Sequence, residues 1–157
     1  MFNNIKLIVY DFDGVMTDNK VYLDQLGNEL VQLSRADGLA IAEFKKLNFQ
    51  QIIISTEKNP VVSMRANKLK IECLQGIEDK KQALLQFCKK YNFNLKNVAY
   101  VGNDINDEEV MKIVAFRFCP LDAHKSIKSI AHNVLNKKGG DGVIRELLDL
   151  KEKFLIK

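Results

Sequence analysis

Strand-length apolar runs alternate with segments of helical periodicity along almost the whole chain of 157 residues. The apolar runs predict strands at residues 5–10, 51–55, near Cys73, 98–102, 116–119 and near Val134. The periodic segments predict helices at residues 39–47, 60–69, 79–91, 107–114, 123–130 and 143–154. Strands that alternate with helices pair in parallel through right-handed crossovers. We therefore expect an α/β fold, a three-layer Rossmann-like doubly wound parallel sheet, in one domain over residues 1–157.

A β-hairpin is the one predicted element that breaks this alternation. Residues 20–24 and 29–33 are typical of paired strands around a turn at 25–28. The insertion is too short to form a cap domain, so a capless fold is expected. Because an unpaired hairpin with apolar side chains invites association, it also predicts contact between copies of the chain. Asp37, shortly after the hairpin, is expected to cap the helix at 39–47.

Charge and composition argue against several classes of function. The formal net charge is +4, and the lysines are scattered among acidic neighbours, which argues against nucleic acid as a partner. No apolar stretch approaches the length needed to cross a membrane. Cys73, Cys88 and Cys119 are odd in number and widely spaced, as expected for free thiols in a reducing compartment. These features predict a soluble cytoplasmic protein.

Paired carboxylates follow the first predicted strand. The apolar run 5–10 leads directly into Asp11-Phe12-Asp13-Gly14. A buried strand seldom ends in two carboxylates for structural reasons, and ligands of open α/β sheets bind at the C-terminal ends of the strands. Two carboxylates beside a glycine that permits a sharp turn indicate a cation site next to a nucleophile. The alternative is an ordinary strand-end turn built from aspartate and glycine.

Three further polar groups follow later strands. Ser55 ends the second strand, Lys80 lies at the start of a helix, and the loop 102–107 reads Gly-Asn-Asp-Ile-Asn-Asp. Because strand ends of a parallel sheet meet at one edge, these groups are expected to converge on Asp11 and Asp13. A hydroxyl and an ammonium can hold phosphoryl oxygens while a hard cation neutralises charge, which suits phosphoryl transfer to a carboxylate. Alone, Ser55 is more often a turn hydroxyl and Lys80 a solvated lysine; their conjunction is more specific.

The order of these motifs resembles that of the haloacid dehalogenase superfamily over essentially the whole chain. The segment 11–18 is similar to its first motif, Ser55 to the second, Lys80 to the third and the loop 102–107 to the fourth. The closer resemblance is to capless sugar-acid phosphatases that act on octulosonate 8-phosphate or nonulosonate 9-phosphate, and to the C-terminal domain of CMP-acylneuraminate synthetases. The segments that also match this branch are 22–29, 65–69 and 139–146.

The resemblance implies a role for each motif residue. Asp11 would attack phosphorus and form a phosphoaspartate, and Asp13 would protonate the leaving alkoxide and later deprotonate the hydrolytic water. Mg²⁺ would bind the Asp11 carboxylate, the Asp13 main-chain carbonyl and a side chain of the fourth motif, Asn103 or Asp104. Ser55 and Lys80 would hold phosphoryl oxygens, and Lys80 would also position Asp11.

The sequence departs from the family pattern at Asn103, where the fourth motif usually has a metal-binding aspartate. An amide still offers a carbonyl oxygen, but one negative charge is gone, and disturbing a ligand shell typically weakens metal binding by about 10–100-fold. Asp104 and Asp107 are the candidates to compensate. The synthetase domains show a similar Gly-Asn-acidic pattern, so a non-catalytic or weakly active oligomerisation or regulatory module related to acylneuraminate cytidylyltransferase is the alternative function. The intact first three motifs favour an enzyme.

Five side chains are candidates for substrate binding. Thr56 and Glu57 stand where octulosonate phosphatases commonly have Gly-Arg. Glu57 resembles the acidic residue of the nine-carbon members, which would repel a carboxylate and accept sugar hydroxyls; the alternative is a glutamate that complements a helix dipole. Arg65 and Lys68 are candidates for the substrate carboxylate, and Arg145 resembles a segment that approaches a neighbouring site. Solvated helix positions are the alternative for these three.

The leading interpretation is a Mg²⁺-dependent phosphatase that acts on the phosphate ester of an acidic sugar. Glu57 slightly favours a nonulosonate 9-phosphate over an octulosonate 8-phosphate. The resemblance also implies a homotetramer, in which the hairpin at 20–33 builds the contact and each active site is covered by a neighbour.

Overall fold

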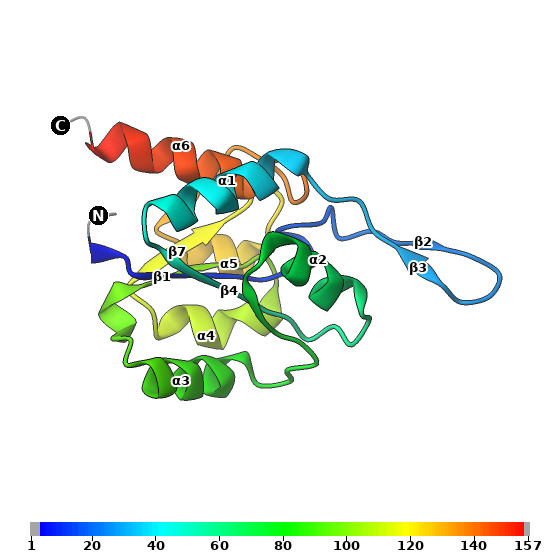
Figure 1. Cartoon of the computed structure of the whole chain (residues 1–157), viewed down its shortest axis with the longest axis horizontal. Helices are drawn as coiled ribbons and strands as arrows, with labels where there is room; N and C mark the ends of the chain where they lie inside the picture. Colours follow the sequence, from blue (N-terminus) through cyan, green and yellow to red (C-terminus); the bar gives the residue numbers. More distant parts are fainter. Residues whose placement is uncertain (1–3, 156–157) are drawn as a thin grey trace.

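A six-stranded parallel sheet forms the middle layer of the molecule (Figure 1). The computed structural model describes residues 4–155, with side chains described as far as Lys151. The strands lie in the order β5-β4-β1-β6-β7-β8, and every neighbouring pair is parallel. Their bounds are β1 Leu7–Tyr10, β4 Gln50–Ile54, β5 Glu72–Leu74, β6 Val98–Val101, β7 Phe116–Cys119 and β8 Asn133–Val134. The predicted doubly wound sheet is confirmed.

Helices cover both faces of the sheet. One apolar cluster joins the first face to α1 (Arg35–Lys46), α2 (Val61–Leu69) and α6 (Val143–Leu155). A second cluster joins the other face to α3 (Lys80–Tyr91), α4 (Glu108–Lys112) and α5 (Lys125–Ile130). Short 3₁₀ turns, Leu95–Asn97 and Ile105–Asp107, precede β6 and α4. The three-layer architecture is therefore as predicted.

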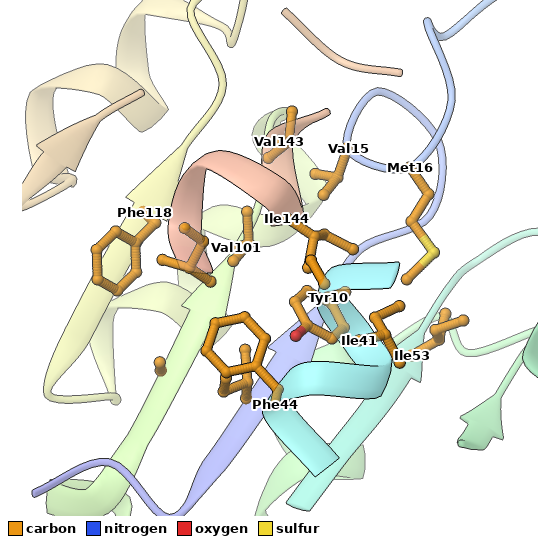
Figure 2. Packing of buried hydrophobic residues seen from close by; sticks show 14 of the residues in the cluster. Tyr10, Val15, Met16, Ile41, Phe44, Ile53, Val101, Phe118, Val143 and Ile144 are labelled. Carbon is orange, nitrogen blue, oxygen red and sulfur yellow. The ribbon is translucent and has the colours of Figure 1, made fainter. Parts of the chain in front are cut away.

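The central strand β1 is apolar at every position because both of its faces are buried. Successive side chains of a strand point to opposite faces, and a parallel sheet covered on both sides buries them all. Ile8 and Tyr10 accordingly pack in the first cluster, while Leu7 and Val9 pack in the second. Figure 2 shows Tyr10 among side chains of α1 and α6. With both faces covered, the ends of the strands are what remains open for chemistry.

The chain changes direction around β1. From β1 it runs outward through β4 and β5, then returns to the other side of β1 as β6 and continues to β7 and β8. Tyr10 is paired with Ile53 of β4 and with Val101 of β6, so the C-terminal ends of the three strands lie level. Open α/β sheets bind ligands at such a switch point. The aspartates after β1, Ser55 after β4 and the loop after β6 all begin there.

The hairpin is shorter than predicted. Its strands are β2 (Tyr22–Leu23) and β3 (Glu29–Leu30), which are antiparallel and project from the body of the molecule (Figure 1). The Asp24 carboxylate accepts the N–H groups of Leu26 and Asn28 and thereby builds the turn. Large apolar side chains along the hairpin are at least half exposed, namely Val21, Tyr22, Leu23, Leu26 and Leu30.

Asp37 does not cap the helix that follows the hairpin, so that prediction is wrong. Helix α1 begins at Arg35, with Ser34 before it, and Asp37 lies buried within the first turn. Its Oδ1 instead accepts the backbone N–H of Arg145 at 2.9 Å, at the start of α6. The first N–H groups of a helix have no partner within it, and Asp37 satisfies one of them across the α1–α6 contact.

The structure also bears on the predictions about the cysteines and about membrane-spanning segments. The three cysteines are free, with Cys88 and Cys119 buried and Cys73 half-buried. Within residues 4–155, no helix combines the length and the apolar character needed to cross a membrane.

Candidate active site

Asp11 follows directly on the buried strand β1. Its backbone N–H donates to the carbonyl of Val101, which extends the β1–β6 pairing by one residue. One carboxylate oxygen, Oδ1, accepts the N–H of Phe12 at 2.7 Å and lies 2.7 Å from Lys80 Nζ. Burial and the carboxylate of Asp107 raise the pKa of Asp11, and the Lys80 ammonium opposes the rise. Asp11 is thus held in one orientation, with its second oxygen directed to the side where Asn103 lies.

Lys80 is a buried cation shared between two carboxylates. It is the first residue of α3, a helix that Asp79 caps by accepting the N–H of Gln82. Its Nζ lies 2.7 Å from Asp11 Oδ1 and 2.8 Å from Asp107 Oδ1, and only 2% of Lys80 is exposed. Burial lowers the pKa of Lys80, but the two ion pairs outweigh it and the net shift is upward. The alternative of a solvated lysine is therefore wrong.

Asp107 closes the site from behind. It is fully buried, and its Oδ1 accepts both Lys80 Nζ and the Tyr100 hydroxyl at 2.8 Å. Its Oδ2 accepts the N–H of Asn103 at 2.9 Å. Because protein donors occupy both oxygens, Asp107 does not stand in for a missing metal ligand. A β-carbon on Gly102 would lie 2.7 Å from the Asp107 side chain, so only glycine leaves room for it.

The Asn103 side chain lies against Asp11 and Asp13. With the amide nitrogen toward them, it donates to Asp11 Oδ2 at 3.1 Å and to the Asp13 carbonyl at 2.9 Å. With the amide oxygen toward them, that oxygen faces Asp11 Oδ2 and the Asp13 carbonyl oxygen, each about 3 Å away, with no proton between them. Adjacent ligands of an octahedral Mg²⁺ at about 2.1 Å are separated by about the same distance. The residues present therefore fit a magnesium ion.

The groups around Asn103 that would hold the ion include only one carboxylate. Among the residues that the structure describes, no three His, Cys, Asp or Glu side chains gather as a metal site. The set at Asn103 consists instead of one carboxylate, one amide and one main-chain carbonyl. Gly14 makes room for it, since a β-carbon there would lie 2.0 Å from the Asn103 amide nitrogen, and the φ of Gly14 is +83°.

Asp13 is more accessible than Asp11 and is held more loosely. Its Oδ1 accepts the Thr17 hydroxyl at 3.3 Å. Partial burial raises the pKa of Asp13, as do the nearby carboxylates of Glu57 and Glu29, while Thr17 opposes the rise. A carboxyl with a raised pKa is suited to give a proton to a leaving group and take one from water.

The loop that carries Asp13 is supported by the segment before α6. Gly140 N–H donates to the Val15 carbonyl at 3.1 Å. A β-carbon on Gly139 would lie 2.3 Å from the Gly14 carbonyl oxygen, so the two backbones are in direct contact. Glu146 fixes the other end of this segment by accepting the N–H groups of Asn136 and Lys137. The match between 139–146 and the sugar-acid branch thus corresponds to a brace behind the aspartate loop.

Ser55 and Thr56 complete the mouth of the site. Ser55 is buried at the end of β4, where its hydroxyl accepts the N–H of Glu57 at 3.1 Å. Thr56 is exposed and lines an open cleft of about 310 Å³. The cleft is lined by Asp11, Asp13, Asn19, Thr56, Asn103, Asp104, Ile105 and Asn106. The cleft therefore brings together residues of the first and fourth motifs and Thr56, the neighbour of Ser55. Direct contact of Ser55 with substrate stays a prediction.

A second cleft of about 230 Å³ is lined by Asp13 and by two further carboxylates, those of Glu29 and Glu57. Glu57 accepts the N–H groups of Lys58 and Asn59 through Oε1, so it does stabilise the backbone ahead of α2, as the alternative reading expected. Glu29 comes from the hairpin, and its Oε2 accepts the Asn59 amide at 3.5 Å. Glu57 also faces the cleft, so both interpretations of this residue have support. Sequence analysis missed Glu29, because a hairpin glutamate carries no chemical signature.

The remaining candidates lie elsewhere or at the rim. Asp104 lines the first cleft while its Oδ1 accepts the N–H of Ile105 at 2.8 Å. Arg65 donates to the Ser34 carbonyl at 3.0 Å, Arg145 donates to the Ala36 carbonyl at 3.4 Å, and Lys68 is exposed on α2. These three cationic side chains do not line either cleft. Their role in binding substrate stays a prediction.

Many known proteins are similar to this chain in sequence or in structure. Residues 35–147 match the haloacid dehalogenase-like hydrolase family. The chain is 35% identical over 148 residues to 3-deoxy-D-manno-octulosonate 8-phosphate phosphatase of Yersinia pestis, which covers 94% of this chain and 79% of that protein.

Solved structures agree. A HAD family hydrolase from Streptomyces avermitilis is 42% identical with a TM-score of 0.91, covering 94% of this chain and 84% of that one. The octulosonate 8-phosphate phosphatase of Moraxella catarrhalis, solved with magnesium ion, phosphate ion and KDO, is 28% identical with a TM-score of 0.92, covering 97% and 88%.

Fold, motif order and these similarities together define a haloacid dehalogenase-like hydrolase, and the chain belongs to that family. Within the family it belongs to the capless sugar-acid phosphatase branch and is a phosphoric monoester hydrolase. The predicted enzyme is confirmed at this level.

Proposed function

We propose that this chain hydrolyses the phosphate ester of an acidic sugar with Mg²⁺, through a phosphoaspartate on Asp11. The observation that carries the proposal is the position of the Asn103 amide, about 3 Å from both Asp11 Oδ2 and the Asp13 carbonyl, beside a lysine that already holds Asp11. A bound Mg²⁺ would neutralise charge on the phosphoryl oxygens. Asp104, at the rim of the same cleft, is the candidate for a further contact through water.

The residues of the site support a two-step reaction. Asp11 attacks phosphorus, the ester P–O bond breaks, and the leaving alkoxide takes its electron pair and a proton from Asp13. Asp13 then takes a proton from water, whose oxygen attacks phosphorus; the P–O bond to Asp11 breaks, and the Asp11 carboxylate and inorganic phosphate are released. Lys80 balances the charge that builds up near Asp11, and the Ser55 hydroxyl is a donor to the phosphoryl group.

Octulosonate 8-phosphate is the first candidate substrate, because relatives that are 35% identical over 148 residues carry that activity in their names. A nonulosonate 9-phosphate is the second, favoured by Glu57. Its carboxylate and that of Glu29 line the cleft beside Asp13, where they can accept sugar hydroxyls and would repel an anion. Thr56 lies at the mouth of the neighbouring cleft. The carboxylate of the sugar acid is then left to cations such as Arg65, Lys68 or Arg145, from the same chain or a neighbour.

A homotetramer is part of the proposal. The hairpin exposes apolar side chains along a projecting arm, and exposed apolar surface of this kind usually marks a contact. Leu26 at its tip is 80% exposed. Each arm would then lie over the site of a neighbouring copy.

The test is release of inorganic phosphate at millimolar Mg²⁺, with and without EDTA. The panel contains octulosonate 8-phosphate, nonulosonate 9-phosphates and hexose phosphates. We expect EDTA-sensitive turnover of one sugar-acid phosphate, and none by Asp11→Asn although that variant stays folded. Equal turnover by Asp11→Asn would refute the assigned nucleophile. A folded wild-type protein that turns over none of the panel would favour the regulatory alternative.

A further inference from the structure

Tyr100 is a fully buried polar side chain that the mechanism above does not use. It lies on β6 within the apolar cluster that faces α3 and α4. Its hydroxyl donates to Asp107 Oδ1 at 2.8 Å. Burial, then the carboxylates of Asp107 and Asp11, raise the pKa of Tyr100 well above its usual value. The hydroxyl therefore remains protonated and acts as a donor at any working pH.

The carboxylate that Tyr100 contacts is the junction of the site. Asp107 Oδ1 is shared by Tyr100 and Lys80, and Asp107 Oδ2 holds the N–H of Asn103. Lys80 in turn bridges Asp107 and Asp11. The N–H of Asp104 also donates to Asp107 Oδ2, at 3.4 Å. Of these four donors, only the Tyr100 hydroxyl belongs to a residue that neither lines the first cleft nor pairs with Asp11.

We propose that Tyr100 is a positioning residue, which fixes Asp107 so that the Lys80 ammonium stays shared between Asp107 and Asp11. The inference rests on the proposed phosphatase function for its kinetic consequence. Its structural basis is the shared oxygen Oδ1 of Asp107.

Competition for one ammonium explains why the hydroxyl matters. Two carboxylates lie 2.7 and 2.8 Å from Lys80 Nζ, so their attractions are nearly balanced. A donor on Asp107 Oδ1 spreads part of that oxygen's charge into a hydrogen bond and weakens its pull on Lys80. Without the hydroxyl, Asp107 draws the ammonium away from Asp11 and from the phosphoryl group. The charge that develops there in the transition state would then be less well stabilised.

The chain offers a matched control in Tyr10. This residue is also fully buried in the sheet, and its hydroxyl also donates a 2.8 Å hydrogen bond to a buried side chain, Gln51 Oε1. It packs in the opposite cluster, against α1 and α6 (Figure 2). Tyr10→Phe and Tyr100→Phe thus remove the same group from equivalent depth, on opposite sides of the sheet.

The experiment compares the two variants with wild type by kinetics and by calorimetric binding of orthovanadate in the presence of Mg²⁺. For Tyr100→Phe we expect kcat to fall about tenfold and KM to change less than about twofold. A tenfold change corresponds to the lower end of the free energy that a hydrogen bond to a charged group contributes. Vanadate affinity should fall by a similar factor, because the oxyanion meets the displaced Lys80. Tyr10→Phe should match wild type in both measurements, with a comparable loss of thermal stability.

The inference would be overturned by equal losses in the two variants, by a change confined to KM, or by unchanged vanadate affinity in Tyr100→Phe. Unfolding of Tyr100→Phe under conditions where Tyr10→Phe stays folded would also overturn it, by showing that the bond serves stability. If the wild type releases no phosphate from any sugar-acid phosphate, the proposed function fails, and the vanadate comparison alone decides the role of Tyr100.

Discussion

Replacing Asn103 by aspartate restores the carboxylate that the family usually has, and the structure allows its effect to be worked out in both metal states. The side chain is almost completely buried. Its amide stands 3.1 Å from Asp11 Oδ2 and 2.9 Å from the Asp13 carbonyl. An aspartate at this place puts a second negative charge beside Asp11 and removes two hydrogen bonds that the amide nitrogen can donate. The metal-free protein should therefore be less stable than wild type.

The magnitude follows from the distance. Two unit charges 3.1 Å apart repel by about 5 kcal/mol at an effective dielectric constant of about 20. A proton shared by the two carboxyls relieves part of this, so we expect a loss of about 2–3 kcal/mol at pH 8, or roughly 5–10 °C in Tm for a chain of this size. With Mg²⁺ the sign reverses, since the added carboxylate should tighten binding about 10–100-fold.

The assay is thermal unfolding as a function of Mg²⁺ concentration, alongside phosphate release. Asn103→Asp should begin below wild type without metal and show the larger rise in Tm, because stabilisation grows with the ratio of ligand to its dissociation constant. Asn106→Asp is the control: it adds the same charge to the same loop, on an exposed residue of the same cleft. Identical Mg²⁺-induced rises in Asn103→Asp and wild type would refute the assignment of Asn103 as a ligand.

Three further outcomes are expected. Gly139→Ala should lower the unfolding free energy by about 2–4 kcal/mol in urea titrations, because its β-carbon would lie 2.3 Å from the Gly14 carbonyl oxygen. Gly27→Ala is the control: its β-carbon would meet no atom within 4 Å, so it should lower the unfolding free energy by only about 1–2 kcal/mol, the cost of its positive φ. Leu26→Ser, at the hairpin tip, should reduce the mass measured by light scattering without lowering the stability of the subunit; an unchanged mass would place the contact elsewhere. Burial raises the pKa of Asp37 to about 6, so the folded protein resists ionising this carboxyl. Between pH 4 and pH 7 the wild type should therefore lose roughly 2–3 kcal/mol of unfolding free energy relative to Asp37→Asn; parallel stability curves would contradict this.

The parallel sheet could be predicted from the sequence because each buried strand is marked by its own short apolar run. A continuous apolar run such as 5–10 signals a strand buried on both faces, and crossovers between parallel strands have one hand. If the strands are parallel, the C-terminal ends of β1, β4 and β6 must share one edge of the sheet, and Asp11 and Ser55 do lie at that edge. Tertiary contacts decide the rest. Ser34 and Asp37 are both good capping residues, and only the donors of α6 determine which function Asp37 serves.

Residues that act through other residues were harder to predict. Tyr100 stands in a run of four buried residues, where an aromatic side chain fits a strand core without any functional meaning. The sequence makes Asp107 a candidate to compensate for Asn103, because its spacing places it in the fourth motif but does not show which way its carboxylate points. Lys80 fixes that direction, since a buried ammonium must be paired and hydrogen-bonded, and here both Asp11 and Asp107 serve as partners. The position of Glu29 in the cleft beside Asp13 depends on the tertiary placement of the hairpin, which no local pattern encodes.

The neutral Asn103 can be understood from the charges it joins. Behind the nucleophile, Asp11 and Asp107 already share a single cation, Lys80. A third carboxylate at position 103 would leave the metal-free site with unbalanced negative charge in a buried place, which is costly. The amide can instead donate to Asp11 and to the Asp13 carbonyl, so the loops after β1 and β6 are joined before any metal arrives. Turning the amide over presents its oxygen to a cation. An asparagine at position 103 therefore binds the metal more weakly than an aspartate would, but it keeps the site assembled when no ion is bound.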